Sequence, residues 1–232
     1  SCGYAAPTPR RKATAFVCMR LYDASMSHRL HGDTDAVPST QRIEAFSDGV
    51  FAILVTLLVL ELKLPFTAES SNASVIGGLL ATMPHVFSFA FSFFALAVFW
   101  VNHHHFFHAI TKTDWVLLWH NVHVLFWLTL VPFTTGMLGE FPTVSVTASI
   151  YAANLALAAL AFSLMTHHAL FHGCFTNGDI PEKERRAFVR RGLMGAVAYA
   201  LAAILAFGSP IVTWILIIAI PAYYVVPRLL RR

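Results

Sequence analysis

The chain has 232 residues, of which 57% are hydrophobic and only 12% are charged, and its formal net charge is +4. A soluble domain usually carries about twice this share of charged residues, so the composition argues against an ordinary soluble enzyme. It indicates an integral membrane protein instead.

Long apolar stretches suited to crossing the ~30 Å hydrocarbon core of a bilayer recur along the chain. We expect an all-α fold with six membrane-spanning helices at residues 43–62, 83–103, 116–138, 146–166, 191–207 and 211–226. Pro132 and Pro221 fall inside the third and sixth, where we expect kinks. One membrane domain would then occupy residues 39–230. Residues 1–38 are polar and aperiodic and contain proline, which predicts a mostly disordered tail.

Positive charge is distributed unevenly between the two sides of this predicted bundle. Every lysine and arginine except Lys63 lies in the N-terminal segment, the second-to-third loop, the fourth-to-fifth connection or the C-terminus. These segments share one side of the membrane, which the positive-inside rule assigns to the cytosol. We therefore expect a multi-pass cell-membrane protein with both termini cytosolic. Because this bias accounts for the net charge, no nucleic-acid partner is expected.

The first predicted helix begins with a polar cluster and continues as an apolar segment, QRIEAFSDGVFAILVTLLVLELKLP at residues 41–65. Arg42, Glu44, Ser47 and Asp48 lie in or beside its first two turns. Charged groups at membrane depth are expensive and usually face protein or water. The cluster therefore makes this helix the candidate functional core.

An aliphatic stripe runs along the same helix. Ile53, Leu57 and Leu60 lie on one face at i, i+4 and i+7, with Thr56 beside them. The stripe could pack against a neighbouring helix or lipid. Alternatively, copies of it could meet on a symmetry axis, where rings of branched side chains constrict a pore and gate it by dewetting. The stripe alone does not decide between these readings.

Short strings in a fixed order carry a resemblance to a known family. They are Arg42-x-x-x-Phe46-Ser47-Asp48-Gly49, Trp100-Val101-Asn102-His103-His104, Leu130-Val131-Pro132-Phe133 and Leu138-Gly139-Glu140-Phe141. With these strings, about residues 40 to 228 resemble the endolysosomal potassium channel family of the transmembrane protein 175 type. The variant present here is similar to its prokaryotic branch.

This resemblance implies a channel that passes potassium and, more weakly, other monovalent cations. Its prokaryotic members are homotetramers whose first helices line the pore, and they lack a TVGYG filter, as does this sequence. By position, the resemblance makes Ile53 the main hydrophobic constriction, with Leu57 and Leu60 as further rings and Thr56 near the pathway. It also implies that Arg42, Phe46, Ser47 and Asp48 belong to a structural network that holds the first helix in place. We expect Trp100, Asn102 and His103 at the end of the second predicted helix to complete this network.

Topology supports such a network independently. The first helix starts on the cytosolic side and the second ends there, so Asp48 and Trp100 lie at similar depth. Trp100, His103 and His104 share a face by their i+3 and i+4 spacing. An indole or imidazole donor is therefore expected to satisfy the Asp48 carboxylate, which is costly to bury unpaired.

Histidine is abundant, with 12 residues, many of them near predicted helix ends on the cytosolic side. The pairs His104/His108 and His168/His172 have metal-compatible i, i+4 spacing, and membrane di-iron oxidoreductases also place histidine boxes at cytosolic helix ends. These boxes are incomplete here, so we expect structural or interfacial histidines, no cofactor and no enzyme. A pH-sensing role is the remaining alternative for them, since histidine titrates near neutrality. A secondary transporter is the other alternative. It would require polar midplane residues, of which the first helix offers only Thr56.

Overall fold

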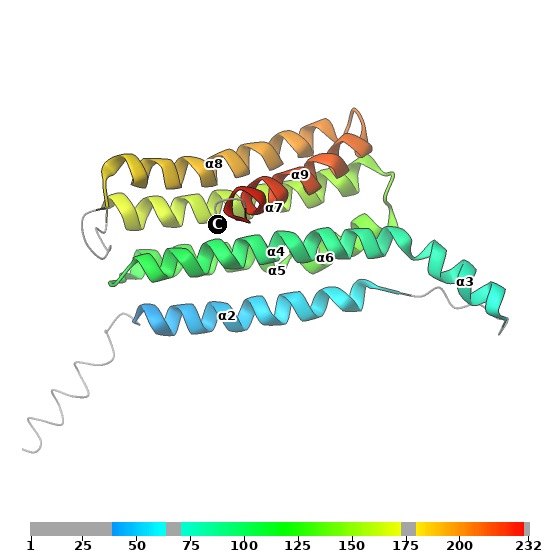
Figure 1. Cartoon of the computed structure of the whole chain (residues 1–232), viewed down its shortest axis with the longest axis horizontal. Helices are drawn as coiled ribbons and strands as arrows, with labels where there is room; N and C mark the ends of the chain where they lie inside the picture. Colours follow the sequence, from blue (N-terminus) through cyan, green and yellow to red (C-terminus); the bar gives the residue numbers. More distant parts are fainter. Residues whose placement is uncertain (1–38, 64–70, 173–179, 230–232) are drawn as a thin grey trace, which may run out of the picture. The chain divides into compact units, whose positions relative to one another are not determined.

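The chain is described by a computed structural model over residues 39–63, 71–172 and 180–229. The predicted tail at residues 1–38 lies outside this part. The described elements are helices (Figure 1): α2 (Thr40–Leu57), η1 (Leu58–Glu61), α3 (Asn72–Ala81), α4 (Met83–Ala109), α5 (Trp115–Thr129), α6 (Val131–Glu140), α7 (Ser145–His167), η2 (His168–His172), α8 (Glu182–Leu205) and α9 (Pro210–Leu229).

Five stretches of helix in the described ranges are long and apolar enough to cross a membrane, and they correspond to the first five predicted spans. They are Thr40–Glu61, Met83–Ala109, Trp115–Glu140, Ser145–His172 and Glu182–Leu205. The sixth predicted span corresponds to α9, whose portion Pro210–Tyr224 is a shorter apolar helix. Helix α3, also short and apolar, lies between the first and second predicted spans.

The helix that contains the fifth predicted span extends beyond the start of that span. The span was predicted from Arg191, and α8 begins at Glu182. The charged residues before Arg191 stabilise the first turns of this helix. Glu182 and Glu184 lie at its positive N-terminal end, and Arg186 pairs with Glu182 at i+4 spacing.

The third predicted span is divided into two helices beside Pro132, where a kink was expected. Helix α5 ends at Thr129 and α6 begins at Val131, with Pro132 in its first turn. The Thr134 hydroxyl donates to the Leu130 carbonyl at 3.2 Å, and the Thr135 hydroxyl donates to the Val131 carbonyl at 2.7 Å. These hydroxyls add hydrogen bonds to carbonyls at the junction of the two helices, and Ser/Thr side chains are among the groups that make proline tolerable in a membrane helix.

Helix α7 is the central element of the bundle. It contacts α5, α6, α8 and α9, and its span is the most buried of the five. Small residues such as Ala152 and Ala202 are fully buried between α7 and α8, which allows the two backbones to approach closely. Helix α2 instead packs against α4, α5 and α6 and lies along one side of the bundle (Figure 1).

Candidate functional site

Helix α2 has one buried face and one exposed face. The buried face follows helical spacing and contacts the neighbouring helices through Ile43, Ser47, Phe51, Leu54 and Leu58. On the other face the predicted stripe is open, since Ile53 is 59% exposed, Leu57 40% and Leu60 65%. Thr56 is exposed as well, and its hydroxyl donates to the Ile53 carbonyl at 2.8 Å. Within the described chain, the aliphatic stripe is therefore not used for packing.

A chain of buried hydrogen bonds joins α2 to α4 through α5. The Asn121 amide nitrogen donates to the Ser47 hydroxyl at 3.0 Å, and that hydroxyl donates to the Ile43 carbonyl at 2.8 Å. His103 Nε2 lies 2.8 Å from the Asn121 amide oxygen. Since the amide oxygen can only accept, Nε2 carries the proton in this arrangement. Ser47, His103 and Asn121 are all fully buried.

Aromatic rings surround the buried imidazole. The ring centroid of His103 lies 4.6 Å from that of Phe107 and 5.6 Å from that of Phe51, which approaches edge-on from α2. Phe162 of α7 lies at 6.5 Å. The position of His103 is thus fixed by packing on three sides as well as by Asn121.

A second, more exposed set of contacts continues toward the N-terminal end of α2. Trp100 Nε1 donates to Asp48 Oδ1 at 2.9 Å. One turn away, His104 Nδ1 lies 3.0 Å from Glu44 Oε1. Trp100 stacks on His104, with ring centroids 5.7 Å apart and an interplanar angle of 22°. Two residues of α2 spaced by four therefore pair with two residues of α4 spaced by four, as antiparallel helices permit.

The structure does not bring every residue of the expected network together. Arg42 and Phe46 lie on the exposed side of α2, outside these hydrogen bonds. Asn102 lines a pocket on a different face of α4. Conversely, Asn121 was not anticipated. Its one sequence signal is an amide in an otherwise largely apolar and aromatic stretch of the third span.

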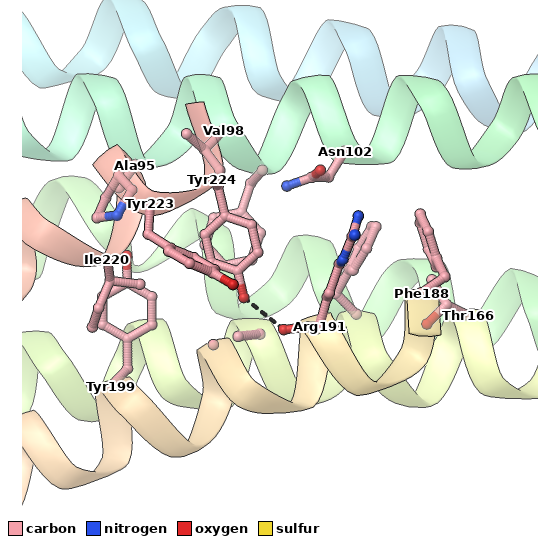
Figure 2. A pocket seen from close by; sticks show the side chains of 16 residues that line it. Ala95, Val98, Asn102, Thr166, Phe188, Arg191, Tyr199, Ile220, Tyr223 and Tyr224 are labelled. Carbon is pink, nitrogen blue, oxygen red and sulfur yellow. Dashed lines mark hydrogen bonds between the residues drawn. The ribbon is translucent and has the colours of Figure 1, made fainter. Parts of the chain in front are cut away.

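The pocket that Asn102 lines has a volume of about 260 Å³ and lies between α4, α7, α8 and α9. Figure 2 shows Arg191 reaching from α8 toward Asn102, while Tyr199 and Ile220 lie at the other end. The Tyr224 hydroxyl donates to the Arg191 carbonyl at 2.6 Å and links α9 to α8. No residue of α2 lines this pocket, so it is separate from the aliphatic stripe.

Known proteins are similar to this chain over the region that contains these contacts. Residues 42–132 match the family described as TMEM175, the endosomal/lysosomal potassium channel. A protein of Chamaesiphon minutus named as a potassium channel is 36% identical over 173 residues, which cover 73% of this chain and 85% of that protein. The crystal structure of a lysosomal potassium-selective channel TMEM175 homolog from Chamaesiphon minutus matches with a TM-score of 0.72 and 33% identity. That match covers 81% of this chain and 97% of that one.

A human relative carries a different description. It is named an endosomal/lysosomal proton channel, TMEM175, and is 24% identical over 164 residues. The match covers 70% of this chain but only 32% of the human protein. The matched family region of this chain, residues 42–132, includes Ser47, Asp48, Trp100, His103 and Asn121.

Proposed function

This chain belongs to the TMEM175 family, and we propose that it forms a potassium channel in the cell membrane. The relatives named above are ion channels, and the first two are described by their potassium conduction or selectivity. We further propose six spans, with α9 as the sixth, and both termini in the cytosol, because nearly all Lys and Arg residues share that side.

The open stripe on α2 is the observation that carries the pore assignment. A helix with one face buried against α4, α5 and α6 leaves Ile53, Leu57 and Leu60 exposed and without a packing partner among the described residues. Four copies arranged around an axis would bury these side chains against one another as stacked aliphatic rings. A narrow apolar ring excludes water and so holds the pore closed or nearly closed until it widens.

Selectivity in such a pore comes from the cost of removing water. An aliphatic ring at Ile53 offers no oxygen ligands, so an ion passing it gives up hydration without direct compensation. Potassium loses its water at lower cost than sodium, so we expect modest selectivity for potassium. Thr56 places a hydroxyl beside the ring, near the ion path.

We propose that the contacts between α2 and its neighbours hold the pore-lining helix at a fixed distance from the axis. The buried chain through Ser47, Asn121 and His103 and the pairing of Asp48 with Trp100 all act on the N-terminal half of α2. Since Ile53 lies less than two turns beyond Asp48, a shift at these contacts would move the constriction.

The proposal is tested by ion flux into liposomes that contain the purified protein. We expect potassium flux to exceed sodium flux in the wild type. Ile53→Asn should raise the leak of ions through the pore and reduce the ratio of potassium flux to sodium flux. Val59→Asn is the matched control, because Val59 is also an exposed aliphatic residue of the same span, at 52%, but lies off the stripe. Equal fluxes for wild type and Ile53→Asn would remove Ile53 from the constriction.

Proton conduction is a second candidate function, favoured by the name of the human relative. The same liposomes distinguish proton conduction from potassium conduction. For this measurement they contain a pH-sensitive dye, and the potassium concentration is equal on both sides of the membrane. Proton flux that depends on Ile53 and exceeds potassium flux would make the proton the main permeant ion.

A further inference from the structure

A cluster of metal-ligating side chains lies where α2 begins and α4 ends. Glu44 of α2 and His104 and His108 of α4 each present one ligand atom, and these three atoms lie within 4.8 Å of one another. Glu44 Oε1 and His104 Nδ1 are 3.0 Å apart. The His104 and His108 ring centroids are 4.4 Å apart. We propose that these three residues form a binding site for a divalent transition-metal ion of the zinc type.

The chemistry of the donors selects this class of ion. Zinc binds imidazole nitrogen and carboxylate oxygen at about 2.0–2.2 Å in tetrahedral sites. Two ligand atoms on such an ion are therefore about 3.3 Å apart, close to the separation already present between Glu44 and His104. Magnesium and calcium prefer sites made of oxygen alone, so two imidazoles disfavour them. One carboxylate and two imidazoles leave a fourth position for water.

Neighbouring side chains orient His104, while His108 remains accessible to solvent. Trp100 stacks on His104 at 5.7 Å and so fixes the plane of that imidazole. His108 is exposed, which gives an ion a path from the solvent side. Glu44 is partly buried and faces both histidines from the opposite helix. Ordered neighbours of this kind raise metal affinity by limiting the motion of the ligands.

An ion bound here would join α2 to α4 directly. Glu44 lies one turn from Asp48, whose carboxylate accepts from Trp100, so the metal would replace the present Glu44–His104 contact by metal–ligand bonds beside that hydrogen bond. In the proposed orientation this end faces the cytosol. Its effect on conduction rests on the proposed function: a metal that fixes α2 against α4 should change potassium flux without entering the pore.

Binding can be measured without reference to flux. The full-length protein, freed of any histidine tag, is titrated with Co²⁺, whose d–d absorption reports tetrahedral ligation, and the Co²⁺ is then displaced with Zn²⁺. We expect saturable absorption for the wild type. His108→Ala and the isosteric Glu44→Gln should each weaken binding by at least about tenfold.

The second histidine pair supplies the control. His168 and His172 have the same i, i+4 spacing, and His172 is also exposed. His172→Ala should bind Co²⁺ like the wild type, and all variants should keep the wild-type elution volume and helix content. Absence of saturable binding by the wild type, equal binding by Glu44→Gln, or loss of binding in His172→Ala would each overturn the site. If binding follows the prediction but Zn²⁺ leaves potassium flux unchanged, the site stands and its coupling to the pore is rejected.

Discussion

The Trp100 indole and the Asp48 carboxylate form a 2.9 Å hydrogen bond that joins the pore-lining candidate α2 to its neighbour α4. Trp100→Phe should lower the free energy of unfolding by about 1 kcal/mol, since it removes the donor but keeps a ring beside His104. Thermal unfolding in detergent measures this change. Trp119→Phe is the control, because Trp119 is 68% exposed and has no such partner among the described residues. Equal melting curves for both variants would contradict a stabilising role for the bond.

Asn121 is expected to matter more for stability than Trp100. Asn121→Leu leaves the Ser47 hydroxyl without a donor and His103 Nε2 without an acceptor, both fully buried. Each unsatisfied buried group costs about 1–3 kcal/mol, so the total loss should be several times that of Trp100→Phe.

Asn154 provides the matched control for that prediction. It is also buried, at 5% exposure, but its amide makes one long contact of 3.5 Å to Thr134 and its Oδ1 has no partner within the described residues. Asn154→Leu should therefore cost much less, or stabilise the protein. A larger loss for Asn154→Leu than for Asn121→Leu would contradict the account of the buried hydrogen bonds.

Asp114, just before α5, should make stability depend on pH. Its carboxylate caps the helix by accepting from the Leu117 amide at 2.6 Å and lies 2.9 Å from His168 Nε2. Desolvation by burial alone would raise the pKa of Asp114, but the Leu117 and His168 contacts outweigh it and lower the pKa below its usual value. A lowered pKa in the folded state means that the charged form stabilises the fold at higher pH. That contribution is lost as the pH falls through the folded-state pKa.

Asp114→Asn isolates this contribution, because asparagine can still cap a helix but does not titrate. The melting temperature of the wild type should exceed that of Asp114→Asn at about pH 5, and the difference should shrink as the pH falls to about 3. A difference that stays constant over this range would show that the charge of Asp114 does not contribute.

Much of this arrangement can be predicted from the sequence because it depends on local pattern and depth. Apolar length marks the first five spans, and Pro132 marks the break between α5 and α6. The contact between Asp48 and Trp100 follows from two antiparallel helices whose polar groups lie at equal depth. Each of these inferences needs only the position of a residue along its own helix.

The remaining features depend on the orientation of each helix about its own axis, which decides which face meets a neighbouring helix. Asn121 meets Ser47 only because α5 turns that face toward α2, which no periodicity in a largely apolar and aromatic stretch reveals. Arg42 and Phe46 share a sequence string with Ser47 and Asp48 but point to the exposed side of α2. The charged first turns of α8 could not be predicted from hydropathy, because a charged helical turn has the same hydropathy as a charged loop.

The central claim is that Ile53 lines the narrowest part of an ion path formed by copies of α2. In a background with Cys2, Cys18 and Cys174 replaced by serine, Ile53→Cys should conduct potassium and be blocked by a methanethiosulfonate reagent. The same treatment of Val59→Cys should leave potassium flux unchanged, since that residue lies off the stripe. Block of Val59→Cys together with unaltered flux in fully modified Ile53→Cys would contradict the account and place the ion path elsewhere.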